Sequence, residues 1–299
     1  SDIGGAWDNA VDFVAVQYGH VLGSRIHGAG DWCMYAKGGS AYLQIERNVL
    51  YDCGTGGFTA GQGTGFQFMS PPWLHYEAYG VQFVDNILHD IEGAAFGVQG
   101  AYHVVIAFNT AYRVGARSHV IEAGFGGRSC DGTPEDESFA RCGQYLAAGG
   151  WGNTRISDGN NFTRIPNRHV YIANNIIYNP QPAQSQWQHL QVFAPYGGEF
   201  QVGSNVPLPA RADDDLIIAG NIIWNGPANH PVGIEEGAGC AAENTSCNLD
   251  QLRRDNAINT IEPVLADPKS GDFSLRSGDH FSAVDLPAFV WDLPYTNVP

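Results

Sequence analysis

Asn175-Ile176-Ile177-Tyr178 is one copy of a four-residue phrase that recurs along the chain. The phrase consists of an asparagine, two mostly apolar residues, and then an aromatic residue or a histidine. Copies begin at Ser24, Asn48, Asn86, Asn109, Asn175 and Asn221, and serine replaces the asparagine in the first copy. Asn86 and Asn109 are 23 residues apart, and the other intervals are longer. Such a repeat predicts stacked units that share one core.

The residues around each phrase favour β-strands. Val104-Val105-Ile106, Val170-Tyr171-Ile172 and Leu216-Ile217-Ile218 are rich in β-branched residues, and each unit is too short for a pair of helices. We expect a strand, a turn and another strand per coil. The predicted fold is all-β: a right-handed parallel β-helix (solenoid) with long loop insertions and an irregular C-terminal closure. Leucine-rich repeats have a similar period, but their leucine spacing is missing.

Two columns of side chains follow from this stacking. The repeated asparagines should form an inward ladder, with each amide bonded to the turns of its own and neighbouring coils. The last residue of each phrase should stack on its neighbour. This aromatic column comprises His27, Tyr51, His89, Tyr112, Tyr178 and Trp224. Both columns are predicted to be structural rather than catalytic.

A chain of 299 residues with 43% hydrophobic residues can bury a large core as a single domain. The coils are predicted to occupy residues 1–237, with insertions at about 54–80 and 124–167. Periodicity then fades. Residues 238–299 are predicted to form a closure packed on the same domain, with a short helix at Leu249–Arg254.

The composition narrows the possible partners. The net charge is −16, and an acidic surface repels nucleic acid and anionic membranes, so neither is an expected partner. No apolar run reaches membrane-spanning length, and the first residues lack the pattern of a secretion signal, which has been removed or was never included. An acidic chain rich in glycine and asparagine is typical of secreted bacterial β-proteins. We therefore expect an extracellular protein.

Six cysteines allow fifteen pairings, and the sequence does not choose among them. Cys130 and Cys142 lie inside one insertion, Cys240 and Cys247 inside another, and Cys33 and Cys53 on successive coils. Local disulfides that staple the loops are the simplest interpretation and imply an oxidising compartment. A zinc site is the alternative, but the usual paired-ligand spacings are missing.

Lys37 is the first candidate catalytic residue. It ends a strand of apolar and aromatic residues and precedes Gly38-Gly39, where a backbone can approach a ligand closely. It is either an outward lysine on a solvated face or a base or clamp in a cleft. The insertions add Trp73, Tyr76 and Trp151, on whose rings a sugar could stack. Packing within the loops is the alternative for these aromatic residues.

Aligning the second strand of each coil suggests a groove. The alignment places Lys37, Met69, Gln99, Glu122, Phe193 and Glu235 in one column, with Tyr35, Gln67 and Gly97 two residues before the first three. Lys37 and Glu122 would lie about 14 Å apart, which is three coil spacings. The predicted substrate-binding residues are Tyr35, Gln67, Gln99, Trp73, Tyr76 and Trp151.

Two kinds of cleavage fit these residues. A lyase needs a base and a cation that neutralises a uronate carboxylate, which Lys37 with Arg128, Arg113 or Arg117 would supply. A hydrolase needs two carboxylates about 5 to 10 Å apart, for which Glu122 with Glu77 or Asp131 are candidates.

Asp213-Asp214-Asp215 is the candidate metal site. Clustered carboxylate oxygens suit calcium, which Asp213 and Asp215 would bind. A solvated acidic turn is the alternative, so no cofactor is certain.

The repeated phrase, the strand end Lys37-Gly38-Gly39-Ser40 and the tail from Asp267 to Gly278 resemble the large bacterial group of secreted right-handed β-helix repeat proteins. That group includes relatives of the polysaccharide lyases and many members of unassigned activity. The resemblance implies the fold and a secreted location. It also implies, for lyases that cut uronate polymers, a lysine or arginine base, a further arginine and often calcium.

Three functions remain open. The first is a polysaccharide lyase or hydrolase that acts in a groove along the β-helix. The second is a non-catalytic glycan-binding or surface protein. The third is a structural protein that self-associates end to end into extracellular fibres, suggested by the absence of a capping segment before the first coil.

Overall fold

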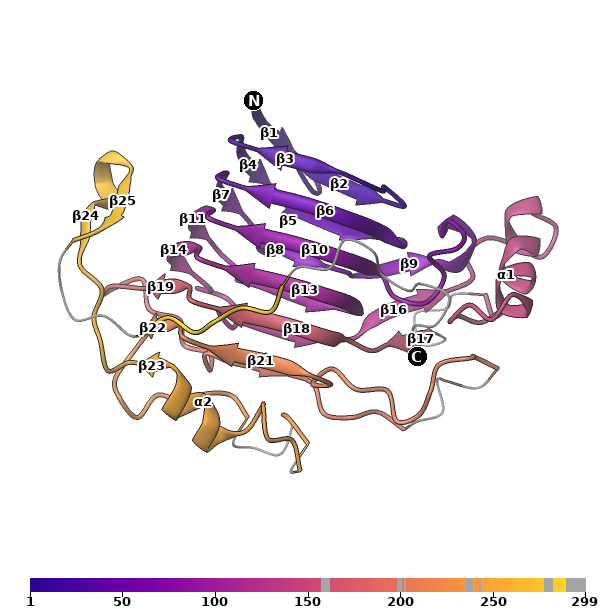
Figure 1. Cartoon of the computed structure of the whole chain (residues 1–299). Coiled ribbons are helices and arrows are strands. Elements are labelled where there is room, and N and C mark those ends of the chain that lie inside the picture. Colours follow the sequence, from indigo (N-terminus) through magenta and orange to yellow (C-terminus); the bar gives the residue numbers. More distant parts are fainter. Residues whose placement is uncertain are drawn as a thin grey trace.

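The computed structural model of the chain describes residues 1–156, 162–197, 201, 203–234, 239–241, 243–276 and 282–288. Most of its strands pair in parallel and lie in three sheets, here named A, B and C, which Figure 1 shows as stacked rows of arrows. The predicted all-β class is confirmed, and the stacked parallel strands are consistent with a β-helix.

Sheet A is the longest of the three. Its strands are β1 (Asp2–Ala6), β4 (Arg25–Ala29), β7 (Val49–Cys53), β11 (Ile87–Ile91), β14 (Thr110–Val114), β19 (Ile176–Tyr178), β22 (Ile222–Trp224) and β23 (Ala257–Ile258). Each repeated phrase, apart from its first residue, lies in this sheet.

Sheets B and C hold the remaining coil strands. Sheet B contains β2 (Val11–Val14), β5 (Trp32–Lys37), β8 (Gly56–Ala60), β12 (Ala94–Gln99), β15 (Ile121–Gly124) and β20 (Leu190–Val192). Sheet C contains β3 (His20–Leu22), β6 (Ser40–Glu46), β10 (Ala78–Val84), β13 (Ala101–Ala107), β18 (Arg168–Ala173) and β21 (Leu216–Ala219).

A coil therefore contributes three strands, not the two predicted. The chain passes from sheet A to sheet B to sheet C and then returns to sheet A, as in β4, β5 and β6. The strands of sheets C and A are separated by a very short turn, since β13 ends at Ala107 and β14 begins at Thr110. In the sequence, two such strands look like one continuous apolar run.

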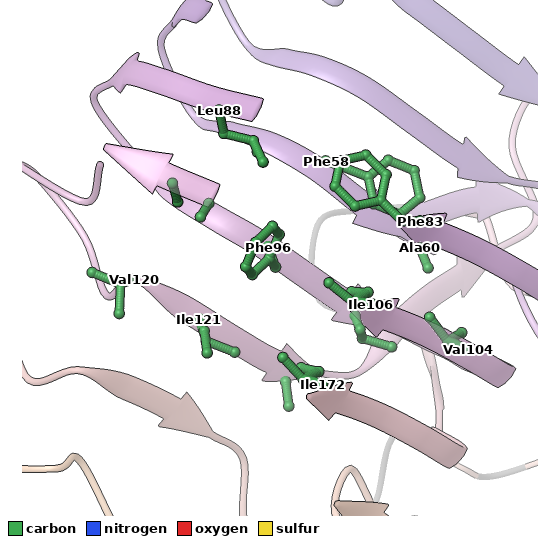
Figure 2. Close-up of a cluster of buried hydrophobic side chains, with 14 of the residues drawn as sticks. Phe58, Ala60, Phe83, Leu88, Phe96, Val104, Ile106, Val120, Ile121 and Ile172 are labelled. Atoms are coloured by element: carbon green, nitrogen blue, oxygen red, sulfur yellow. The ribbon is translucent and has the colours of Figure 1, made fainter. Parts of the chain in front are cut away.

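The core lies between the three sheets. Figure 2 shows Phe58 and Phe96 from sheet B, Phe83 and Ile106 from sheet C and Leu88 from sheet A turned toward one another. The rings of Phe58 and Phe83 stack with centroids 4.5 Å apart, and both side chains are fully buried. Burying one such side chain stabilises the fold by roughly 1.5–3 kcal/mol.

The predicted asparagine ladder is present and buried. Asn86 donates from its backbone and side-chain nitrogens to Oδ1 of Asn109 at 2.8 and 3.1 Å, and its side chain also donates to the Ile45 carbonyl at 3.0 Å. The same pattern links the members in order: Asn48, Asn86, Asn109, Asn175, Asn221 and Asn256. Asn256 extends the ladder one coil beyond the predicted copies.

The aromatic column runs along the outer face of sheet A. His27 stacks on Tyr51, and Tyr51 on His89, with centroids 4.6 and 4.9 Å apart. Phe273, from the C-terminal hairpin, then joins the column at 4.9 Å from His89 and 5.8 Å from Tyr112. The prediction is thus confirmed for these rings, and the tail provides an unexpected member.

Two excursions from the coils pack together. The first contains β9 (Gly63–Gly65) and η1 (Phe66–Phe68), and the second contains β16 (Gly126–Ser129), α1 (Glu137–Ala147) and β17 (Thr163–Ile165). β16 pairs in parallel with β9 and antiparallel with β17, so the excursions share a small sheet. The first excursion starts later than predicted, because β8 (Gly56–Ala60) belongs to sheet B.

Beyond the last coils lie α2 (Leu249–Asp255), which includes the predicted short helix, and the antiparallel hairpin of β24 (Leu265–Asp267), η3 (Pro268–Ser270) and β25 (Asp272–Leu275). Figure 1 shows this hairpin on the side of the molecule opposite α1. The predicted boundary at residue 237 lies outside the described residues.

All six cysteines form disulfides: Cys33–Cys53, Cys130–Cys142 and Cys240–Cys247, with Cα–Cα distances of 5.4, 6.1 and 5.6 Å. The local pairing expected for the two loops is confirmed. The Cys33–Cys53 bond joins two successive coils and closes a separation of 20 residues.

Candidate functional site

The register of sheet B changes the predicted groove. Tyr35 lies opposite Thr59, which in turn lies opposite Gly97, and Glu122 lies opposite Gly97. Glu122 therefore belongs to the column of Tyr35, whereas Gln99 lies opposite Gly124. The predicted alignment of Gln99 with Glu122 was wrong by two residues. Gln67 and Met69 were wrongly placed in it as well, because their segment lies in the excursion and β8 supplies the coil strand.

Lys37 and Glu122, both in sheet B, contact different partners. Nζ of Lys37 lies 3.0 Å from Oε1 of Gln62 and 4.4 Å from the centre of the Tyr35 ring. Glu122 accepts a hydrogen bond from the Ser118 hydroxyl. Two further strands, β8 and β12, separate β5 from β15, so the register leaves the lysine and the carboxylate about 14 Å or more apart.

Glu77 and Arg128 form a buried ion pair. Neither side chain has any exposed surface. Arg128 donates to Oε1 of Glu77 through Nε and Nη2, and through Nη1 to the carbonyls of His75 at 2.7 Å and Trp151 at 2.6 Å. Oε2 of Glu77 accepts from the Gly38 amide at 3.1 Å. Glu77 and Arg128 therefore join the two excursions. Because both side chains are fully buried, a substrate cannot reach them.

The predicted substrate-binding aromatic residues lie together. Trp73, Tyr76 and Trp151 belong to one cluster of buried side chains, and the rings of Tyr76 and Trp151 are 4.8 Å apart. They are only 7%, 1% and 3% exposed, so most of their surface packs within the loops. Gln67 is also buried, and it donates to the carbonyl of Asp131 at 2.8 Å.

A small pocket nevertheless opens beside two of these rings. Its volume is about 110 Å³, and its lining includes Tyr76, Trp151, Arg168, Arg211 and Asp214. Nε of Arg168 lies 3.4 Å from a carboxylate oxygen of Asp214. A few water-sized groups fill this volume. The pocket therefore has room for a carboxylate or hydroxymethyl substituent of a sugar.

Titratable side chains continue from the pocket along the outer face of sheet C. His169 follows Arg168 in β18, and its Nδ1 is hydrogen-bonded to Oδ2 of Asp215. The Tyr171 hydroxyl donates to the same oxygen at 3.0 Å. The side chains of His169 and Asp215 are 31% and 36% exposed, so a substrate can reach them. The sheet C site is defined here as the pocket together with His169, Tyr171 and Asp215.

The backbone of sheet C explains why these side chains line up. Left-handed backbone conformations recur at one register position in successive strands. They occur at Tyr18, Tyr42, Gly80, His103, His169 and Asp215, with φ between 49° and 60°. Most residues avoid this region, and its repetition bends every strand at the same place. The bend places His103, His169 and Asp215 in one column.

Burial and neighbouring charges set the protonation of the site. Burial, with the carboxylate of Asp215, raises the pKa of Tyr171 to about 12. Burial lowers the pKa of His103, and the nearby His169 lowers it further. At neutral pH the phenol of Tyr171 is therefore a proton donor. Asp215, bonded to both partners, holds His169 and Tyr171 in fixed orientations.

The acidic triplet does not fit a shared calcium site. Asp213 is buried, and its Oδ2 already accepts from Arg211 at 3.1 Å, the Ala241 amide at 2.7 Å and Asn244 at 2.9 Å. Asp215 turns instead to His169 and Tyr171. Within the described part of the chain, no group of three or more His, Cys, Asp or Glu side chains could hold a metal ion.

Sequence reasoning did not nominate Arg168, His169 or Tyr171. The three residues share one strand, β18, and strands β19 and β20 with their loops separate it in the sequence from Asp215. The sequence does show a histidine and a tyrosine two residues apart, and later an acidic triplet. Only the pairing of β18 with β21 brings the two features together.

Comparisons with protein-family models, with curated proteins and with solved structures gave no match. No helix in the described ranges is long and apolar enough to cross a membrane.

Proposed function

We propose that the protein is a secreted right-handed parallel β-helix protein, related in fold to polysaccharide lyases, that acts on an acidic polysaccharide. The stacked parallel strands and the continuous asparagine ladder support this fold class. Three disulfides support an oxidising compartment, as expected outside the cell.

One observation carries the choice of reaction: an arginine-lined pocket adjoins a partly exposed His169–Asp215–Tyr171 group. β-Elimination at a uronate unit needs a cation for the carboxylate, a base for the neighbouring proton and an acid for the leaving oxygen. The sheet C site offers a candidate for each. Hydrolysis needs two carboxylates that face each other across a gap. Here Asp214 pairs with Arg168, and Asp215 is engaged by His169 and Tyr171.

In the proposed reaction, the substrate carboxylate enters the pocket beside Arg168 and Arg211. His169 removes the proton from the carbon next to that carboxylate. The released electron pair forms a double bond to the adjacent carbon, and the bond from that carbon to the glycosidic oxygen breaks. Tyr171 donates its proton to the leaving oxygen. Asp215 stabilises the imidazolium that forms at His169.

The experiment is incubation with acidic and neutral polysaccharides, reading ultraviolet absorbance of unsaturated ends and reducing sugar in parallel. We expect both signals on an acidic polymer. His169→Gln and Tyr171→Phe should each lower the rate by about 100-fold or more, the usual loss for a general base or acid. Lys37→Gln and Glu122→Gln are the controls, and they should retain the wild-type rate.

Three results would contradict parts of this proposal. Reducing ends without unsaturated ends would replace elimination by hydrolysis. Loss of activity in Lys37→Gln with full activity in His169→Gln would move the site to sheet B. Binding of a polymer that stays intact would establish a non-catalytic glycan-binding protein.

A further inference from the structure

A groove separates the C-terminal hairpin from the outer face of sheet A. Its volume is about 520 Å³, and its lining includes Arg25, His89, Asp90, Arg113, Lys269 and Phe273. The hairpin tip over the groove is held by Phe273, which is 6% exposed and packs against His89 and Tyr112. Sheet A and the tail thus build the groove jointly.

The charge of the groove is opposite to that of the chain. The chain has 31 acidic and 15 basic side chains, yet the described lining of the groove has three cations, Arg25, Arg113 and Lys269, and one carboxylate, Asp90. Arg113 is paired with Asp90. Arg25 donates to the Tyr51 hydroxyl at 3.0 Å and lies 3.9 Å from Asp2.

Lys269 is the least engaged of these cations. It lies in η3 at the tip of the hairpin, and no carboxylate in the described part of the chain forms an ion pair with it. The ammonium group of Lys269 and the exposed guanidinium group of Arg25 line the same groove, and together they attract an anion.

The size and lining of the groove indicate which kind of molecule would bear the negative group. Its volume falls within the range of about 300–1,000 Å³ that is usual for ligand sites. The ring of His89 stacks on Phe273, and burial together with Arg113 and Arg25 lowers the pKa of His89, so the imidazole is neutral at pH 7. A neutral aromatic wall beside cations suits a sugar unit that carries a negative group.

We propose that the groove under the hairpin is a second glycan-binding site, specific for a sugar unit that carries a carboxylate or sulfate group, with Lys269 and Arg25 as the residues that bind the anion. This site lies on sheet A, whereas the proposed reaction takes place on sheet C. The proposal depends on the proposed function only in taking a sugar as the carrier of the anion.

The test is calorimetric titration of the chain at low salt with a uronate tetrasaccharide, a sulfated tetrasaccharide and neutral cellotetraose. The first two distinguish the carboxylate from the sulfate, and we expect at least one of them to bind and the neutral sugar to bind at least tenfold more weakly. Lys269→Gln and Arg25→Gln should each weaken acidic-sugar binding by about two- to fivefold, the range for losing one partly exposed charge contact.

Arg141→Gln is the matched control. It removes the same charge from exposed α1, on the opposite side of the molecule in Figure 1, and should leave affinity unchanged. Arg168→Gln tests the sheet C pocket separately and should lower cleavage while the groove still binds.

Equal affinities of wild type, Lys269→Gln and Arg25→Gln would overturn the assignment. So would an equal loss in Arg141→Gln, which would indicate nonspecific attraction, or a failure of both acidic sugars to bind. The proposed lyase activity is judged by cleavage, so either proposal can fail alone.

Discussion

Single buried asparagines determine how one coil follows the next. Asn109 accepts two hydrogen bonds from Asn86 and donates to Oδ1 of Asn175 and to the Phe83 carbonyl. Its side chain is 1% exposed, so water cannot replace these partners. Each residue of the ladder therefore satisfies polar groups on the coils before and after it.

We predict that Asn109→Ala lowers the free energy of unfolding by about 2–4 kcal/mol, because buried donors and acceptors on two coils lose their partners. Urea unfolding measures the change. Asn229→Ala is the control, since this asparagine is exposed, and its effect should stay within about 0.5 kcal/mol. A similar small effect of both substitutions would argue against the ladder as a source of stability.

The ladder could be predicted because its signal is local: one asparagine at a fixed place before two apolar residues. Asn256-Ala257-Ile258-Asn259 keeps this beginning but ends in asparagine, so the last member was missed. The sheet C site could not be read in the same way. His169 and Asp215 meet only through strand register, and an excursion lies between their strands.

Among the larger elements, the two excursions are joined by one ion pair. Glu77 lies between η1 and β10, and Arg128 lies in β16, so their contact links the first excursion to the second. The bond from Oε2 of Glu77 to the Gly38 amide connects both to sheet B. These residue types suggested catalysis in the sequence, where burial is not visible.

Glu77→Gln is predicted to destabilise the protein by about 3–5 kcal/mol, because it leaves the charge of Arg128 buried without its counter-ion. Thermal unfolding of the variant would show the loss. Glu92→Gln is the control. It breaks an ion pair on the surface, in which Glu92 is 59% and Arg117 69% exposed, and should lower the free energy of unfolding by about 1 kcal/mol or less. The prediction fails if the two substitutions have equal effects.

Across the whole molecule, partly or fully buried histidines link the stability of the fold to pH. Burial is the main cause that lowers the pKa of four of them. These are His75, His89, His103 and His119. In the unfolded chain, each would titrate near its ordinary pKa of 6.5. As pH falls through that value, the unfolded state binds protons that the folded state does not, so stability present above it is lost.

The melting temperature should therefore fall as the pH is lowered from about 7 to 5, before ordinary carboxylates titrate. Calorimetry over this range measures how steeply the melting temperature depends on pH. His103→Gln should make this dependence less steep, whereas replacement of Lys269 should leave it unchanged. A melting temperature that is constant or rises toward pH 5 would contradict this account.

The direction of the asparagine ladder also bears on where the stack of coils ends. Each side-chain amide donates one hydrogen to the next asparagine of the ladder and the other to a carbonyl of the preceding coil. The row therefore has a direction, and its last asparagine has no further asparagine to donate to. Asn256 is that last asparagine. It keeps the usual bond to the preceding coil, at the Ile218 carbonyl 2.8 Å away, and donates its other hydrogen to the Leu252 carbonyl of α2 at 3.0 Å. The hydrogen that a further coil would accept is thus already taken. Helix α2 thus ends the asparagine ladder, because its Leu252 carbonyl takes the place of the next asparagine.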